Sequence, residues 1–97
     1  MIQSVTLHEL YVRLHDLHGD LDWGSEDRDI VAHIAHSLHD DIEDSGRSRS
    51  VRRAIWSAPV TRTLIHEIID DCFDYDEYLE TSVRGRAARI LSELANL

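Results

Sequence analysis

Several residue types are scarce or missing in this chain of 97 residues. Lysine is absent, and cysteine, proline and methionine each occur once. A single cysteine, Cys72, excludes an internal disulfide and a zinc site made with other thiolates. A single proline, Pro59, means that only one position carries the residue that interrupts helices most strongly. Surface physics does not demand this lack, because lysine serves as well as arginine on solvated helix faces. A G+C-rich genome or adaptation to salt would each account for it.

Long hydrophobic runs are missing as well. The longest apolar runs are two or three residues, whereas a helix that spans a bilayer needs about 20 apolar residues. The first four residues, Met-Ile-Gln-Ser, lack the basic and apolar regions of a signal peptide. The sequence therefore predicts no membrane association and a cytoplasmic location.

Acidic and basic residues fall into separate blocks. Residues 1–46 carry eleven carboxylates and two arginines, residues 47–62 carry five arginines and no acid, and residues 63–80 carry seven acids and no base. The formal net charge is -9. A field of this sign repels nucleic acid and anionic lipid, and it speeds the encounter with basic proteins. We therefore expect a protein partner with a basic surface, and neither nucleic acid nor a membrane.

The length fits a single domain over residues 1–97. A chain of this size buries only about two-thirds of its unfolded surface. Such a chain can fold alone, but its modest core favours a homodimer.

Periodic apolar residues predict two helices in the first half of the chain. Thr6 opens a capping-box sequence, and the helix after it should stop near Gly19. Its apolar face comprises Leu7, Leu10, Tyr11, Leu14 and Leu17. Ser25 should cap a second helix that fades by Gly46, and Trp23 between the two should fold back onto the core. The core-facing stripe of the second helix comprises Ile30, Val31, Ile34, Ala35, Leu38 and Ile42.

The region before the single proline is predicted to contain a short helix. Residues 45–50 have no apolar anchor and should form an exposed loop. A short helix over 51–57 should follow and bury Val51, Ile55 and Trp56. Pro59 should end this helix, and it could also occupy the first position of the next one.

Two further helices complete the predicted fold. The third long helix should run to about Leu79, with a core face of Leu64, Ile65, Ile68, Ile69 and Cys72. Thr81 or Ser82 should cap the last helix, with a core face of Ala87, Ile90, Leu91 and Leu94. No run alternates like a strand. The sequence therefore predicts an all-α fold, a compact bundle of four main amphipathic helices plus a short helix before Pro59.

Three histidines step by three along the second predicted helix. On a helical wheel, His33, His36 and Asp40 fall within an arc of about 60° opposite the apolar stripe. A histidine and an aspartate one turn apart can hold a divalent metal, with His15 and His18 as candidates from another helix. The alternative is a solvated polar face that happens to use histidine. This short pattern assigns no metal and no cofactor.

Two segments, residues 40–44 and 70–74, spell Asp-Asp-x-x-Asp. Helical isoprenoid synthases bind diphosphate through magnesium with such motifs, but their long cavity needs a longer chain. A related set of acids resembles, in outline, the paired acids of the all-α nucleoside-triphosphate pyrophosphatases: Asp41, Asp44, Glu67 and Asp70. That resemblance implies magnesium that bridges phosphates and activates water. Aspartate stands where glutamate is usual, and a chain with nineteen acids contains many such pairs.

Three other features have structural interpretations. Cys72 lies within an apolar stripe, which predicts a small buried side chain rather than a nucleophile. His66 should lie at the edge of the core. The one dense basic patch could contact a phosphate backbone, as in a helix-turn-helix, but no aromatic residue interleaves it and the whole domain is acidic. It is therefore expected to pair with an acidic face of this chain or of a dimer mate. The patch comprises Arg47, Arg49, Arg52 and Arg53.

The acids of the third long helix lie in its C-terminal half, where the helix dipole disfavours them. Such a cluster suggests a receptor for a basic partner, and tyrosines among acids are common in interfaces. The structural alternative is internal pairing with Arg84, Arg86 or Arg89. The expected partner-binding residues are Asp70, Asp71, Asp74, Tyr75, Asp76, Glu77 and Tyr78. The sequence thus predicts a non-enzymatic, acidic regulatory protein without a cofactor. It would act as an inhibitor of the immunity or antitoxin kind, as a mimic of DNA charge, or as a phage accessory protein. The alternative is the magnesium-dependent pyrophosphatase.

Overall fold

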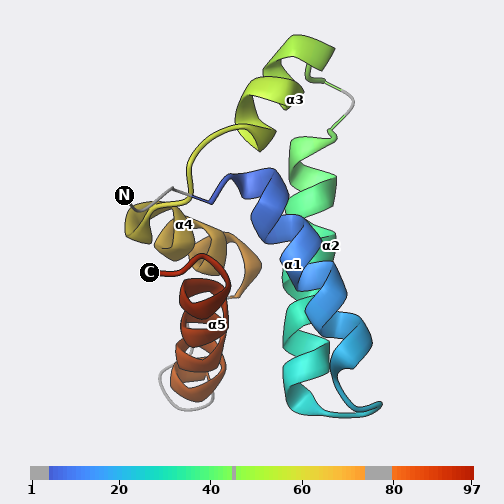
Figure 1. Ribbon diagram of the computed structural model, residues 1–97, viewed down its shortest axis with the longest axis vertical. Helices are drawn as coiled ribbons and strands as arrows, with labels where there is room; N and C mark the ends of the chain where they lie inside the picture. The colour runs from blue at the N-terminus through green and yellow to red at the C-terminus, as the bar shows by residue number, and fades with distance from the viewer. Residues whose placement is uncertain (1–4, 45, 74–79) are drawn as a thin grey trace.

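The computed structural model describes residues 5–44, 46–73 and 80–97. Within these residues the chain forms five helices (Figure 1): α1 (Leu7–Asp20), α2 (Glu26–Ile42), α3 (Arg49–Trp56), α4 (Arg62–Cys72) and α5 (Glu80–Leu94). Helices α1 and α2 run in opposite directions side by side, and α3 stands at the end of this pair. The strand-like pairing in the described part of the chain is a single isolated bridge between Thr6 and Pro59.

The first two helices start where their capping residues predict. The Thr6 hydroxyl accepts a hydrogen bond from the Glu9 N–H at 3.2 Å. The Ser25 hydroxyl accepts one from the Arg28 N–H at 3.2 Å. Each cap satisfies a backbone donor that has no partner inside the helix.

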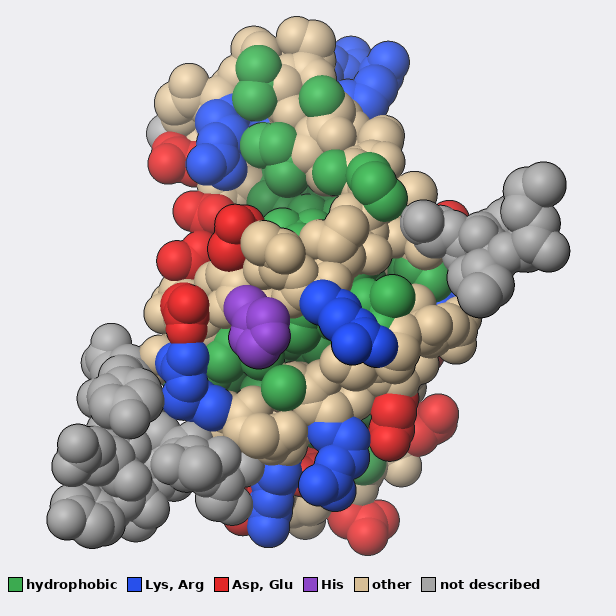
Figure 2. Space-filling model, turned by 90° about the vertical axis from the view of Figure 1, so that its left-hand side faces the viewer, with side chains coloured by type: hydrophobic (Ala, Val, Ile, Leu, Met, Phe, Trp, Pro, Cys, Tyr) green, Lys and Arg blue, Asp and Glu red, His purple; other side chains and the backbone are tan. Residues whose placement is uncertain are grey.

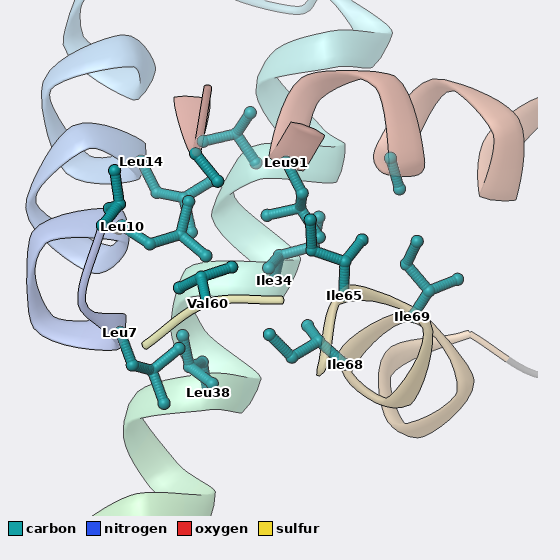
Figure 3. Close-up of a cluster of buried hydrophobic side chains, with 14 of the residues drawn as sticks. Leu7, Leu10, Leu14, Ile34, Leu38, Val60, Ile65, Ile68, Ile69 and Leu91 are labelled. Carbon is teal, nitrogen blue, oxygen red and sulfur yellow. The ribbon is translucent and has the colours of Figure 1, made fainter. Parts of the chain in front are cut away.

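The hydrophobic core lies between α1, α2, α4 and α5 (Figure 3). Its largest fully buried side chains include Leu10 and Leu14 from α1, Ile34 from α2 and Leu91 from α5. From α4, three isoleucines turn toward them: Ile65, Ile68 and Ile69. The predicted apolar stripes are therefore the buried faces. The all-α bundle of four main helices plus a short helix before Pro59 is confirmed.

Helix α3 differs from the other four because the structure records no buried residue in it. It begins at Arg49, where the preceding Ser48 accepts a hydrogen bond from the Val51 N–H at 3.3 Å. The prediction of a loop through residue 50 is therefore wrong by two residues. The predicted burial of Val51 is also wrong, since this side chain is 47% exposed. The helix lies at the end of the bundle, where it contacts α1 and α2.

A backbone clip fastens the segment after α3 to the start of the chain. The Leu7 N–H donates to the Ala58 carbonyl at 2.9 Å, and the Val60 N–H donates to the Val5 carbonyl at 2.7 Å. Pro59 lies between these bonds, where its missing N–H costs no pairing. The suggestion that Pro59 starts α4 is wrong, because Thr61 is the N-cap of that helix.

Helix α4 ends earlier than the sequence predicts. It stops at Cys72, and Phe73 adopts an extended backbone. The His33 Nε2–H donates to the Cys72 carbonyl at 2.7 Å, and an Arg84 N–H donates to the Phe73 carbonyl at 2.9 Å. Side chains from α2 and α5 thus satisfy carbonyls that another helical turn would have used. The predicted extension to Leu79 is therefore wrong.

Helix α5 packs its predicted face, with Ala87 and Leu91 buried, against the bundle. Because the helix begins at Glu80, Thr81 and Ser82 lie within it, and the prediction that one of them caps it is wrong. An ion pair of 2.7 Å between Arg86 and Glu26 connects α5 to the first turn of α2. No helix in the described ranges is long and apolar enough to cross a membrane.

The prediction for the turn between α1 and α2 is also wrong. Trp23 was expected on the core, but its side chain is 89% exposed. The Arg28 guanidinium lies 3.8 Å from the centre of the indole ring, a cation–π contact that orients the ring outside the core. The same guanidinium donates from Nε to His18 Nε2 at 3.2 Å.

Candidate functional site

A groove with an apolar floor and an acidic rim lies between α2, α3 and α4. Its volume is about 480 Å³. Three carboxylates on its rim come from two helices: Asp41, Glu67 and Asp71. The floor is apolar and includes Leu38, Ile42, Ile55, Leu64 and Ile68. We call this feature the acidic groove, and none of its described lining residues is basic.

Helical spacing explains why the rim is acidic. Glu67 and Asp71 are four residues apart on α4, so both project from the same face of that helix. Asp41 projects from α2 on the other side of the groove. Figure 2 shows hydrophobic side chains below the α3 end of the molecule, with acidic side chains beside them. The arrangement offers an apolar surface together with negative charge along its edge.

The thiol of Cys72 also lines the acidic groove. Burial raises the pKa of this thiol above its usual value, and the Asp71 and Asp41 carboxylates act in the same direction. The Ser37 hydroxyl opposes this shift. The side chain is half-buried rather than fully buried, so the predicted core position is only partly correct. A raised pKa leaves little thiolate at neutral pH, which suits a contact residue better than a nucleophile.

The predicted partner-binding residues divide into three groups. Asp71 lies on the rim of the acidic groove. Asp70 points elsewhere and pairs with Arg84. The other five lie outside the described residues: Asp74, Tyr75, Asp76, Glu77 and Tyr78. Of the two predicted residues that the structure describes, one therefore lies on the acidic groove.

The four acids of the pyrophosphatase alternative are also divided. Asp41 and Glu67 line the same groove, whereas Asp44 and Asp70 do not line it. Within residues 5–44, 46–73 and 80–97, no group of three histidine, cysteine, aspartate or glutamate side chains is placed to hold a metal. The structure thus brings together half of the acids that this alternative needs.

The structure also places the predicted metal ligands of α2 apart from one another. His33 caps α4 through the Cys72 carbonyl, whereas His36 lines a different groove between α1 and α2. Asp40 is exposed and lies 3.8 Å from the His39 ring. His15 and His18 do lie opposite His36 across that groove, and His66 is exposed rather than at the core edge. The three predicted ligands of α2 therefore have three different surroundings.

Two arginines of the predicted basic patch form polar contacts within the chain. Arg52 forms an ion pair of 2.7 Å with Glu43, and Arg47 donates to the Asp41 carbonyl. The expected pairing with acidic partners in the same chain is thus seen for Arg52. For Arg49 and Arg53, the described residues include no ion-pair partner within 4.0 Å.

No family model, curated protein or solved structure matches this chain. The function of the acidic groove is therefore argued from its own residues, charges and shape.

Proposed function

We propose that the protein binds the basic surface of another protein through the acidic groove and regulates that partner by occupying it. The observation that carries this proposal is the placement of Asp41, Glu67 and Asp71 around one apolar floor. An apolar floor supplies contact area, and charges at its edge select a partner of opposite sign. The net charge of -9 would steer such a partner toward the protein.

The carboxylates of the groove are available to a partner. The ion pairs in the described part of the chain use other acids, among them Glu26, Glu43 and Asp70. The three rim carboxylates have no arginine within 4.0 Å among the described residues. Internal pairing therefore does not cancel the charge of the groove.

The shape of the groove favours one kind of contact. An amphipathic helix can place its apolar residues on the floor between α2 and α4, in the helix-in-groove mode of recognition. Arginine or lysine residues beside that apolar face would reach the rim. We therefore expect the partner to present a basic amphipathic segment.

A model peptide tests the proposal without knowledge of the natural partner. The probe is an amphipathic helix with leucines on one face and arginines at its edges, and its affinity is measured by calorimetry at low and high salt. The groove variant carries Asp41→Asn, Glu67→Gln and Asp71→Asn. A matched control carries Asp16→Asn, Asp20→Asn and Asp22→Asn, exposed residues outside the groove that change the net charge equally.

The groove variant should bind the peptide about tenfold more weakly than the control variant, because three exposed charge contacts are lost. Binding to the wild type should weaken as salt rises, since salt screens these contacts. Equal losses in the two variants would mean that net charge alone attracts the peptide, and the groove would not be the site.

Magnesium separates this proposal from the pyrophosphatase alternative, which shares Asp41 and Glu67. The alternative requires magnesium to raise the melting temperature and a nucleoside triphosphate to release pyrophosphate. The binding proposal expects neither effect. Pyrophosphate release that disappears in the groove variant would support the enzyme instead.

A further inference from the structure

A second pocket lies against another face of α3 and has the opposite charge. Its volume is about 500 Å³, within the range of small-molecule sites. The residues that matter for binding are His8, Glu43, Arg49, Arg52, Arg53 and Trp56. We call this feature the arginine pocket. Three guanidiniums against one carboxylate leave it with a formal charge of +2 from these residues.

The α3 residues of the arginine pocket share one helix face. Arg49, Arg52, Arg53 and Trp56 follow the spacing i, i+3, i+4 and i+7, which places them in one stripe. Ile55 projects from a different face of α3 and lines the acidic groove. The same short helix therefore contributes to two sites of opposite character.

The arginines of this stripe are unfavourably placed for helix stability alone. Arg49 and Arg53 carry like charges four residues apart, which destabilises a helix. The first turn of α3 also has no acidic residue, although the helix dipole favours acids there. An anion bound in the arginine pocket would relieve both effects.

Glu43 holds two of the pocket residues in position. Its carboxylate accepts hydrogen bonds from Arg52 at 2.7 Å and from the Trp56 indole N–H at 2.9 Å. The Trp56 ring is half-buried, and it forms T-shaped pairs with the Tyr11 ring at 5.3 Å and the His8 ring at 6.1 Å between ring centres. The Arg52 Nε is shielded from solvent and has no hydrogen-bond partner among the described residues. The pocket thus presents an oriented ring next to the exposed guanidiniums of Arg49 and Arg53.

We infer that the arginine pocket binds a nucleotide, with its phosphates on the guanidiniums of Arg49, Arg52 and Arg53 and its base against the Trp56 ring. Guanidinium groups match phosphate oxygens because they donate two parallel hydrogen bonds. An aromatic ring beside them gives a planar base a surface for stacking. This site is separate from the acidic groove, so either site can exist without the other.

Tryptophan fluorescence offers a direct test. Trp23→Phe leaves Trp56 as the one tryptophan of the chain, and Trp23 lies in the turn between α1 and α2, away from α3. In this background, ATP, pyrophosphate and adenosine are titrated separately at low salt. The pocket variant adds Arg49→Gln and Arg53→Gln. The matched control adds Arg62→Gln and Arg89→Gln, which lie outside the pocket and remove the same charge.

We expect ATP to change the Trp56 fluorescence saturably, pyrophosphate to bind more weakly and adenosine to bind most weakly. The pocket variant should bind ATP at least tenfold more weakly than the control, since two phosphate contacts are lost. ATP should also raise the melting temperature of the unmodified protein.

No saturable change with ATP, or equal affinity in both variants, would overturn the inference. Pyrophosphate as tight as ATP would overturn the role of the ring. An oligothymidylate bound more tightly than ATP would indicate a nucleic-acid surface instead.

Discussion

The four-helix core and helix α3 are held in place by different interactions. In the core, buried leucine and isoleucine side chains from α1, α2, α4 and α5 pack together. Helix α3 has no buried residue in the structure, and it contacts the bundle through two partly buried side chains, Ile55 and Trp56, together with polar bonds. Arg52 and Trp56 both bond to Glu43, and a backbone clip fastens the segment that follows.

This difference bears on function because both candidate sites involve α3. The acidic groove uses Ile55, and the arginine pocket uses the stripe from Arg49 to Trp56. A helix with little apolar burial can open locally at low cost in free energy, while the core stays folded. We therefore expect both sites to respond to changes in α3 that leave the bundle intact.

The largest effect should follow from a cavity in the core. Leu14 is fully buried, so Leu14→Ala should lower the free energy of unfolding by about 2–5 kcal/mol. Urea titration followed by circular dichroism measures this change. A loss below about 1 kcal/mol would mean that the four-helix core is looser than its packing suggests.

The next largest effect compares two N-caps. Ser25→Ala removes the cap of α2, a core helix, and should lower the global free energy of unfolding by about 1 kcal/mol. Ser48→Ala removes the equivalent cap of α3. It should speed amide exchange in residues 49–56 with a smaller global loss. Equal global losses would show that α3 unfolds together with the core.

A smaller effect depends on pH. Hydrogen bonds from Trp56 and Arg52 lower the pKa of Glu43 below its ordinary value of 4.5. Because the pKa is lower in the folded protein, the ionised carboxylate stabilises the fold at pH values above its ordinary pKa. This contribution is lost as the pH falls through the pKa of the folded protein. The NMR signal of the Trp56 indole N–H should therefore shift with a midpoint below 4.5. The Glu43→Gln variant should lack that transition, and an unchanged transition would assign it to another group.

The smallest effect is expected at Val51. This side chain is largely exposed on α3, so Val51→Ala should change the free energy of unfolding by less than about 0.5 kcal/mol. The same urea titration measures it. A loss as large as that of a core residue would contradict the exposed position.

Local signals in the sequence predicted much of the bundle. Thr6 and Ser25 mark the starts of α1 and α2 because capping is a short-range interaction. The end of α4 was not predictable from its own residues. It depends on His33, which is 39 residues from the carbonyl it caps, and on Arg84 from α5.

The candidate sites were predictable only in part. Glu67 and Asp71 share a helix face that spacing alone reveals, but only packing brings Asp41 of α2 opposite them. The stripe from Arg49 to Trp56 was also readable from spacing. The sequence analysis did not connect Trp56 with these arginines, because it considered only the residues between the arginines, and none of those is aromatic.

Disulfide trapping at Cys72 tests most directly whether the acidic groove receives a basic amphipathic segment. Cys72 is the one cysteine of the chain and lines the groove, so the leucine-arginine peptide is given a single cysteine on its apolar face, activated as a disulfide with thionitrobenzoate. The Cys72 thiolate attacks the peptide sulfur of that disulfide and releases thionitrobenzoate. We expect a mixed disulfide to form faster than with a scrambled peptide of equal charge. The variant with Asp41→Asn, Glu67→Gln and Asp71→Asn should slow the reaction, although removing nearby negative charge makes the thiol itself more reactive. Equal rates with the amphipathic and scrambled peptides would contradict the account.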